Sequence, residues 1–230
     1  MGDYLGVTQS LRARISRVGE HLRVLAEYDV EELERLNTVV LELNREYANA
    51  QVELAQTNLK LHQREAQILE AAMADQLTGV GNRHRLEQAL ALEVERAERT
   101  GEPMAAFMAD LDHFKQVNDE YGHQAGDNVL AAFGQLLREQ TRATDILARF
   151  GGEEFVVLLP HTGMAQAVAI AERTREALAL LQIEPVPHPV TGSFGVAVLA
   201  PGERAEGLIR RMDASLYAAK DAGRNRVVAS

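Results

Sequence analysis

The feature that most restricts the fold is a long run without helix breakers. From Glu31 to Ala72 the chain has neither proline nor glycine. Within it apolar residues recur at heptad spacing, at Leu33, Val40, Tyr47, Leu54, Leu61 and Ile68, with Leu36, Leu43 and Ala50 on the companion position. This is the a/d seam of a coiled coil. One helix cannot bury such a seam, so we expect residues 31–74 to form a parallel homodimer, with antiparallel or intramolecular pairing as the alternative.

The residues at the companion position become less apolar toward the C-terminal end of the run, where Thr57 and Arg64 follow Ala50. An arginine there must lay its stem along the seam and carry its charge outward, which loosens the pairing. This part of the stalk is therefore predicted to be the adjustable one.

The first thirty residues have another seam, in a different phase. It consists of Leu11, Ile15, Val18, Leu22 and Leu25, and it predicts a helical segment over residues 1–30. Asp29 followed by Glu32 has the spacing of a helix N-cap with its capping-box glutamate, so either a helical hairpin or a stutter in register fits here. We expect this segment to be a small input region, a partner-binding region or the remnant of a longer chain.

After Asp75 strands alternate with helices. Strand-like stretches are "MAAFMADL", "DILARF", "FVVLLP", "TGSFGVAVL" and "RNRVVA", and helical patterns separate most of them, one beginning near Gly126. This order predicts that residues 75–230 form an α/β domain, a sheet with packed helices and one hairpin.

Composition excludes several classes of function. The net charge is −10, which argues against a protein that binds nucleic acid polymers or a membrane surface through clustered basic residues. The absence of cysteine rules out disulfides and thiolate metal sites. The chain has no apolar run of membrane-spanning length and no signal-peptide core, so we expect a cytoplasmic protein without a membrane segment.

Acidic residues gather at the ends of two predicted strands. Asp110 and Asp112 follow "MAAFMA", and Glu153 and Glu154 lie in the turn "FGGEEF". If these strands are neighbours, the carboxylates meet and could hold Mg²⁺, which prefers oxygen ligands. A solvated hairpin at Gly151 and Gly152, and aspartates that merely end a strand, are the simpler alternatives.

Further polar residues that could bind a nucleotide follow Asp112 and lie near the C-terminus. Lys115, Asn118 and Asp127 offer a cation, an amide and a carboxylate on a predicted loop and helix start, and an amide with a carboxylate can read a guanine edge. Asp127 could equally be a first-turn acid. Lys220 and Arg224 lie four apart, on one face if the last helix continues past the glycine, as phosphate ligands or as helix-dipole compensation.

Five ordered blocks resemble the GGDEF family of diguanylate cyclases. They are "DQLTGVGNRHRL", "DLDHFKQVNDEYGHQAGD", "GGEEF", "TGSFGVAVL" and "AKDAGRNRV", and they span essentially all of Asp75 to the C-terminus. The resemblance implies an α+β fold like the palm of adenylyl cyclases and polymerases. It also implies condensation of two GTP into cyclic di-GMP, with Mg²⁺ or Mn²⁺ as the cofactor and release of two pyrophosphates.

The resemblance also implies roles for individual residues. Asp110 and Glu153 would bind the metal, helped by the Leu111 carbonyl, with Glu154 as a further catalytic acid. Asn118 and Asp127 would recognise guanine, and Lys115, Lys220 and Arg224 would contact phosphates. Gly151 and Gly152 would let the triphosphate approach the backbone. Because each domain of this family holds one GTP, two domains must face each other.

A product-binding site is implied as well. "RATD", Arg142 to Asp145, has the spacing of the family's inhibitory RxxD motif, and Arg173 resembles its partner arginine. A surface ion pair between Arg142 and Asp145 is the alternative. Other functions to be weighed are a noncatalytic cyclic di-GMP receptor and an inert coiled-coil adaptor, and the input signal could come from an upstream sensor or partner protein.

Overall fold

The computed structural model describes residues 12–27 and 30–230. The chain divides into two compact units, residues 1–66 and 67–230. The first contains two strands, β1 (Arg12–Val18) and β2 (His21–Glu27), and most of the long helix α1 (Val30–Ala72). Among the described residues, no helix is both long and apolar enough to cross a membrane.

The helix predicted within residues 1–30 is wrong for residues 12–27, which form an antiparallel hairpin. Ile15 pairs with Val24 and Val18 with His21, and Gly19 turns the chain with φ 64°. The predicted seam does not lie on one face, because Ile15 and Val18 are an odd number apart and point to opposite sides of a strand. Spacings of three and four are also compatible with β structure when a glycine turn interrupts them. Leu11 and Asp29 lie outside the described residues.

Helix α1 is continuous, and the predicted seam positions whose side chains are described are exposed; the side chain of Ile68 lies outside this description. Leu33, Leu36, Val40, Leu43, Tyr47, Leu54 and Leu61 are between 49% and 64% exposed. Isolated exposed apolar side chains are ordinary, but a continuous stripe of them marks a surface for association. The described seam residues therefore form the exposed apolar stripe that the heptad predicts.

The second unit is built on a five-stranded sheet with the order β4-β5-β3-β6-β7. The strands are β3 (Met104–Leu111), β4 (Ile146–Gly151), β5 (Glu154–Pro160), β6 (Gly192–Val198) and β7 (Val227–Ala229). All neighbours are antiparallel except β6 and β7. The predicted fold class, a sheet with packed helices, is confirmed.

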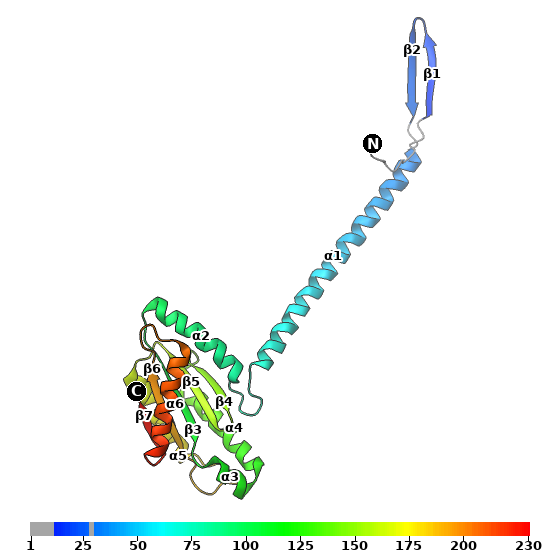
Figure 1. The fold of residues 1–230 in the computed structure, drawn as a ribbon. Coiled ribbons are helices and arrows are strands. Elements are labelled where there is room, and N and C mark those ends of the chain that lie inside the picture. Colours follow the sequence, from blue (N-terminus) through cyan, green and yellow to red (C-terminus); the bar gives the residue numbers. More distant parts are fainter. Residues whose placement is uncertain (1–11, 28–29) are drawn as a thin grey trace. The chain divides into compact units, whose positions relative to one another are not determined.

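Helices cover both faces of this sheet (Figure 1). One face packs against α4 (His123–Gln140) and α5 (Met164–Leu180), with α3 (Phe114–Tyr121) beside α4. The other packs against α2 (Arg83–Thr100) and α6 (Ala205–Asp221).

The central strand β3 divides its side chains between these two layers. Ala105, Phe107, Ala109 and Leu111 belong to the α4/α5 core, whereas Met104, Ala106 and Met108 belong to the α2/α6 core. Side chains of a strand alternate between faces. Asp110 continues the second series, so its carboxylate is directed to the face that carries α6.

The stretch after β3 differs from the sequence prediction. Residues predicted as a polar loop form the short helix α3, and α4 begins at His123 rather than near Gly126. Phe114 and Val117 are the buried residues of α3, and these two apolar positions, three apart, are enough to dock one short helix. Asp127 consequently lies in the second turn of α4, not in its first.

Candidate functional site

The carboxylates predicted to meet are brought together by the register of β3 and β5. Asp110 lies directly opposite Glu154, and directly opposed residues of antiparallel strands have adjacent side chains. Phe155 fixes this end of β5 because it is fully buried and packs edge-to-face on Phe133 of α4, with ring centroids 4.9 Å apart. An apolar anchor thus holds the acidic edge in place.

The turn that joins β4 to β5 consists of Gly152 and Glu153. Of the two glycines in the motif, Gly152 has a positive φ, 52°, and Gly151 does not. Gly151 instead lies next to a register shift in β4. An added Cβ at either glycine would meet nothing within 4 Å, so the surface over the turn is open to a ligand.

An arginine that the sequence reasoning did not single out braces this turn. The Arg149 Nε donates to the Gly152 carbonyl over 2.8 Å, and its Nη1 lies 3.3 Å from a carboxylate oxygen of Asp75. Asp75 in turn accepts from the backbone amide and hydroxyl of Thr78. The segment that follows α1 is therefore connected to the acidic turn. Asp75 begins the first quoted motif and Arg149 lies in the strand stretch "DILARF", but their pairing spans 74 positions.

Two carboxyl groups of the acidic edge have raised pKa values, and such groups favour a bound cation. Burial raises the pKa of Asp110, and the nearby Glu153 carboxylate adds to this, while the Lys220 ammonium opposes it. Burial also raises the pKa of Glu154, with repulsion from Asp110 as the next cause. Lys220 Nζ lies 2.8 Å from Asp110 Oδ2. Carboxylates that raise one another's pKa are stabilised when positive charge is added.

The donor set fits a magnesium ion that arrives with a phosphate ligand. Asp110, Glu153 and Glu154 supply carboxylate oxygens, the ligands that Mg²⁺ prefers, and Mg²⁺ commonly uses one or two carboxylates together with substrate phosphates. Within the described part of the chain, no group of three histidine or acidic side chains could hold a metal by itself. Leu111 is the last residue of β3 and is buried; whether its carbonyl takes part stays a prediction.

Asp112, two residues after Asp110, has a different set of partners. Strand β3 ends at Leu111, so Asp112 lies beyond the strand, and its carboxylate has partners of its own. The Asp112 carboxylate accepts from the Ser193 and Thr191 hydroxyls, over 2.7 and 2.8 Å, and from the Asn225 backbone amide over 3.0 Å. Both of its oxygens are engaged, which makes it a structural acceptor.

The proposed guanine-reading residues lie beside one another on α3 and α4. An added Cβ on Gly126 would lie 2.0 Å from Asn118 Oδ1, so the Asn118 amide packs on the glycine that precedes Asp127. The absence of a side chain at Gly126 is what permits this approach. Asn118 and Asp127 are partly buried, and Lys115, in the first turn of α3, is exposed. The Asn118 amide thus lies against the residue of α4 that precedes Asp127.

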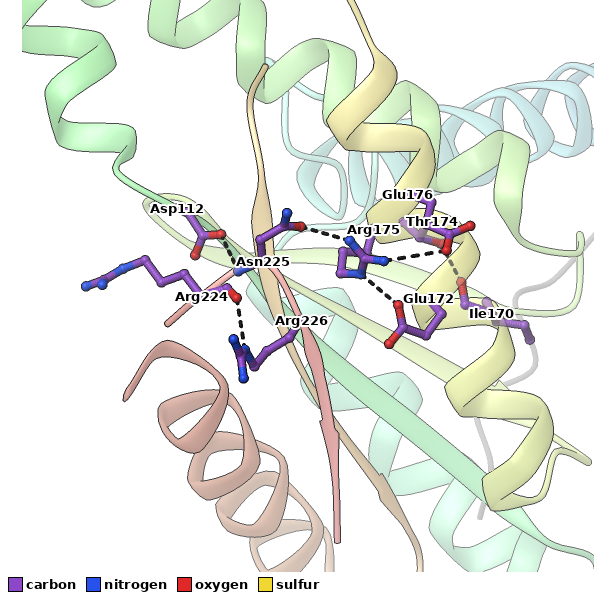
Figure 2. A network of polar contacts seen from close by, with 9 residues as sticks. All are labelled: Asp112, Ile170, Glu172, Thr174, Arg175, Glu176, Arg224, Asn225 and Arg226. Carbon is purple, nitrogen blue, oxygen red and sulfur yellow. Dashed lines mark hydrogen bonds and ion pairs between the residues drawn. The ribbon is translucent and has the colours of Figure 1, made fainter. Parts of the chain in front are cut away.

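Lys220 and Arg224 do not share a helical face. Helix α6 ends at Asp221, and its end is closed by two bonds, from Gly223 N–H to the Lys220 carbonyl and from Arg224 N–H to the Ala219 carbonyl. This is a Schellman arrangement. Arg224 follows the last helical residue of α6 by three positions and has a φ of 63°. Figure 2 shows its side chain projecting away from the polar contacts around Arg175.

The predicted product-binding residues form a second cluster. Asp145 is buried and accepts from the Arg142 backbone amide over 2.8 Å, and burial raises the pKa of Asp145. A pocket of about 500 Å³ adjoins it, lined by Arg142, Arg85 and Arg138 among others. Arg173 of α5 binds the Gln140 side chain and carbonyl over 2.7 and 2.6 Å, at the end of α4 just before Arg142.

Comparison with known proteins agrees with this geometry. The family model described as "Diguanylate cyclase, GGDEF domain" matches residues 72–226. The chain is 36% identical over 225 residues to diguanylate cyclase DgcP of Pseudomonas aeruginosa, an alignment that covers 97% of this chain and 32% of DgcP. The chain thus spans about a third of the length of that curated relative.

Two solved structures are similar to this chain in both sequence and fold. The coiled coil and GGDEF domain of DgcB from Caulobacter crescentus, in complex with c-di-GMP, is 30% identical with a TM-score of 0.72 and covers 83% of this chain and 99% of DgcB's solved chain. Diguanylate cyclase SiaD from Pseudomonas aeruginosa, in complex with its activator SiaC, is 33% identical with a TM-score of 0.67 and covers 87% of this chain and 84% of SiaD's. Sheet, motifs and family model agree, and the chain belongs to the GGDEF family of diguanylate cyclase domains.

Proposed function

We propose that this chain condenses two GTP molecules into cyclic di-GMP as a homodimer. The observation that carries the proposal is the pairing of Asp110 with Glu154 beside the Glu153 turn, under the Lys220 ammonium. Asp110 is buried and Glu154 is partly buried, and the pKa of each carboxyl is raised. Such carboxylates favour a bound metal cation, which adds positive charge beside them. Membership of the family and the cyclic di-GMP complex of DgcB support the same activity.

In this proposal each residue acts on a defined part of GTP. Asn118 and Asp127 hold the guanine edge, Lys115, Lys220 and Arg224 contact phosphates, and the bare backbone of Gly151 and Gly152 lies under the triphosphate. Asp110 and Glu153 hold Mg²⁺ or Mn²⁺ with the help of the Leu111 carbonyl. When bound, the metal neutralises charge that develops on the α-phosphate as the 3′-hydroxyl of the second GTP attacks and pyrophosphate leaves.

The acid residue in the turn gives the sharpest test of this site. Glu153→Gln keeps the size and hydrogen-bonding ability of the side chain but removes its charge. We expect cyclic di-GMP formation to fall by roughly 100-fold or more, the scale of a lost catalytic group, with unchanged folding and self-association. The matched surface variant Glu95→Gln should keep wild-type turnover. If Glu153→Gln retains as much turnover as Glu95→Gln, the assignment is contradicted.

A dimer is required because each domain is expected to hold a single GTP. The bare seam of α1 supports it, and so does the similarity to a solved coiled coil with its GGDEF domain. We infer that α1 pairs in parallel with a second copy and controls whether the two half-sites meet. The noncatalytic receptor and the inert adaptor are disfavoured by the complete acidic edge.

Product inhibition is the second part of the proposal. The Arg142 guanidinium, the neighbouring arginines of the pocket and Arg173 suit a cyclic dinucleotide, because arginine binds phosphodiesters and stacks on guanine. Arg142→Ala leaves the backbone contact to Asp145 in place and should relieve inhibition by added cyclic di-GMP. Arg99→Ala, a change at an exposed position in the last turn of α2, should not. Equal inhibition of both variants would reject the site.

The N-terminal hairpin is proposed as the place where an upstream partner acts. Ile15, Val18, Leu22, Val24 and Leu25 are each more than half exposed. A two-stranded hairpin is only marginally stable alone, so a partner that covers these side chains would stabilise it. The similar SiaD was solved with its activator. Removal of residues 1–27 should leave basal turnover and abolish activation by such a partner.

A further inference from the structure

The loop after α6 carries the proposed phosphate ligand Arg224 in an unusual backbone conformation. Arg224 and Asn225 have φ values of 63° and 43°. L residues with side chains rarely adopt this left-handed region, although asparagine tolerates it better than most. Two such residues in succession persist only where surrounding contacts hold them. The contacts that do so are therefore informative about function.

Asn225 is held from two sides, as Figure 2 shows. Its backbone amide donates to the Asp112 carboxylate over 3.0 Å, and its side-chain Oδ1 accepts from Arg175 Nη1 over 3.0 Å. Asp112 is itself immobilised by the hydroxyls of Thr191 and Ser193. One residue next to Arg224 is thereby connected to the end of β3 and to α5.

Arg175 is as firmly fixed as Asp112. Only 19% of its side chain is exposed, and its guanidinium also contacts Glu172 at 2.7 Å and Glu176 at 3.5 Å. All three of these partners engage different nitrogens of one planar group, which sets its orientation. Arg175 therefore presents a rigid donor to Asn225 from a helix that makes no part of the proposed nucleotide site.

The loop is also anchored on its far side. The Phe194 backbone amide donates to the Arg226 carbonyl over 2.9 Å, at the start of the pairing between β6 and β7. The Arg226 Nε donates to the Arg224 carbonyl over 3.0 Å. With the Schellman bonds before it and these bonds after it, the backbone of Arg224 is held at both ends. The Arg224 guanidinium and Arg175 lie on opposite sides of the loop, and the Arg224 side chain points away from Arg175 (Figure 2).

We propose that Arg175 and Asp112 are positioning residues that lock the Arg224–Asn225 backbone, so that Arg224 is preorganised to contact the phosphates of GTP. The inference rests on the proposed function and goes beyond it, because neither residue touches the nucleotide. Preorganisation lowers the ordering cost of binding. Loss of either residue should therefore weaken nucleotide affinity through Arg224, rather than only lower stability.

The test measures binding of a GTP analogue whose α–β bridging oxygen is replaced by methylene, by calorimetry with Mg²⁺, so turnover is not needed. Arg175→Met and Arg224→Met should each weaken binding by about tenfold. The double variant should lose little more than one single variant, because both changes remove the same contact. Asn225→Gly keeps the left-handed backbone accessible, removes the Arg175 contact and should match Arg175→Met.

The matched control is Arg211→Met. Arg211 binds Glu203 and the carbonyls of Val198 and Ser230, at the end of the sheet opposite to Asp110, so it should lower thermal stability without changing affinity. The proposal is overturned if Arg175→Met and Asn225→Gly bind the analogue as tightly as Arg211→Met does. It is also overturned if the losses of Arg175→Met and Arg224→Met multiply in the double variant. Wild-type protein that binds no analogue would overturn the proposed function itself.

Discussion

The partly buried carboxyl of Glu154 gives a prediction about stability and pH. Its pKa is raised by burial and by Asp110. Between the ordinary pKa of a glutamate, about 4.3, and the raised value, the folded state binds more protons than the unfolded state. The free energy of unfolding therefore falls as pH rises through this window. Glu154→Gln removes this penalty, so at pH 7 its melting temperature should exceed that of the wild type by a few degrees.

Thermal unfolding of both proteins across acidic and neutral pH checks this sign. The advantage of Glu154→Gln should disappear as pH falls below the ordinary pKa. The exposed Glu95 of α2 offers the control Glu95→Gln, for which no such pH-dependent gain is expected. A variant Glu154→Gln that is less stable than the wild type at neutral pH would show that the carboxylate stabilises the fold.

The contact between Gly126 and Asn118 gives a prediction about affinity. A methyl group at Gly126 would lie 2.0 Å from Asn118 Oδ1 and 3.1 Å from Phe114 Cζ, so the amide must move. Gly126→Ala should raise KM for GTP by roughly tenfold or more, because a displaced binding group is costly, with a smaller effect on kcat. Gly163→Ala, where the added atom meets nothing within 4 Å, is the control. Unchanged KM in Gly126→Ala would argue against guanine recognition by Asn118.

Some side-chain pairings could be predicted from the sequence and others could not. Asp110 and Glu154 were expected to meet because two strand patterns with acids at their ends restrict the register. The Arg149–Asp75 and Arg175–Asn225 contacts join positions 74 and 50 residues apart. Arginine on a helix and asparagine in a loop are ordinary surface residues, so no local pattern marks them. Positive φ at Arg224 is likewise decided by tertiary contacts.

Helix α1 gives a prediction about length. Because heptad register fixes the rotation of whatever follows a coiled coil, insertions between Thr57 and Arg64 should change turnover with a period of seven residues. Insertion of seven residues should restore activity that insertions of three or four reduce. Product formation at equal dimer concentration is the measurement. Turnover that does not depend on insert length would show that α1 is only a tether.

The secondary structure that sequence reasoning missed has a common cause. Long periodic patterns, such as that of α1 and the sheet strands, were predicted because many positions agree. The β1–β2 hairpin and α3 are short, and spacings of three and four over a few residues fit more than one conformation. The turn at Gly19 favours a β-hairpin over a helix in residues 12–27. Burial of Phe114 and Val117 favours a helix over a loop in α3.

The complete chain is expected to work only as a pair. The seam of α1 is bare, and the acidic edge offers ligands for one metal-bound nucleotide. Leu36→Glu with Leu43→Glu should therefore separate the copies and abolish turnover, while the globular unit still binds the GTP analogue. Sedimentation together with product analysis would check this, and full activity in a proven monomer would contradict the dimer requirement.

The most direct test of the central claim is incubation of purified protein with GTP and Mg²⁺ at a concentration where sedimentation shows a dimer. Pyrophosphate release is followed and the nucleotide product is identified by mass, with Glu153→Gln alongside. The account predicts cyclic di-GMP from the wild type and about two pyrophosphates per product, with progressive slowing that Arg142→Ala relieves. A dimer that binds GTP but forms no cyclic di-GMP, or Glu153→Gln that forms it equally well, would contradict the account.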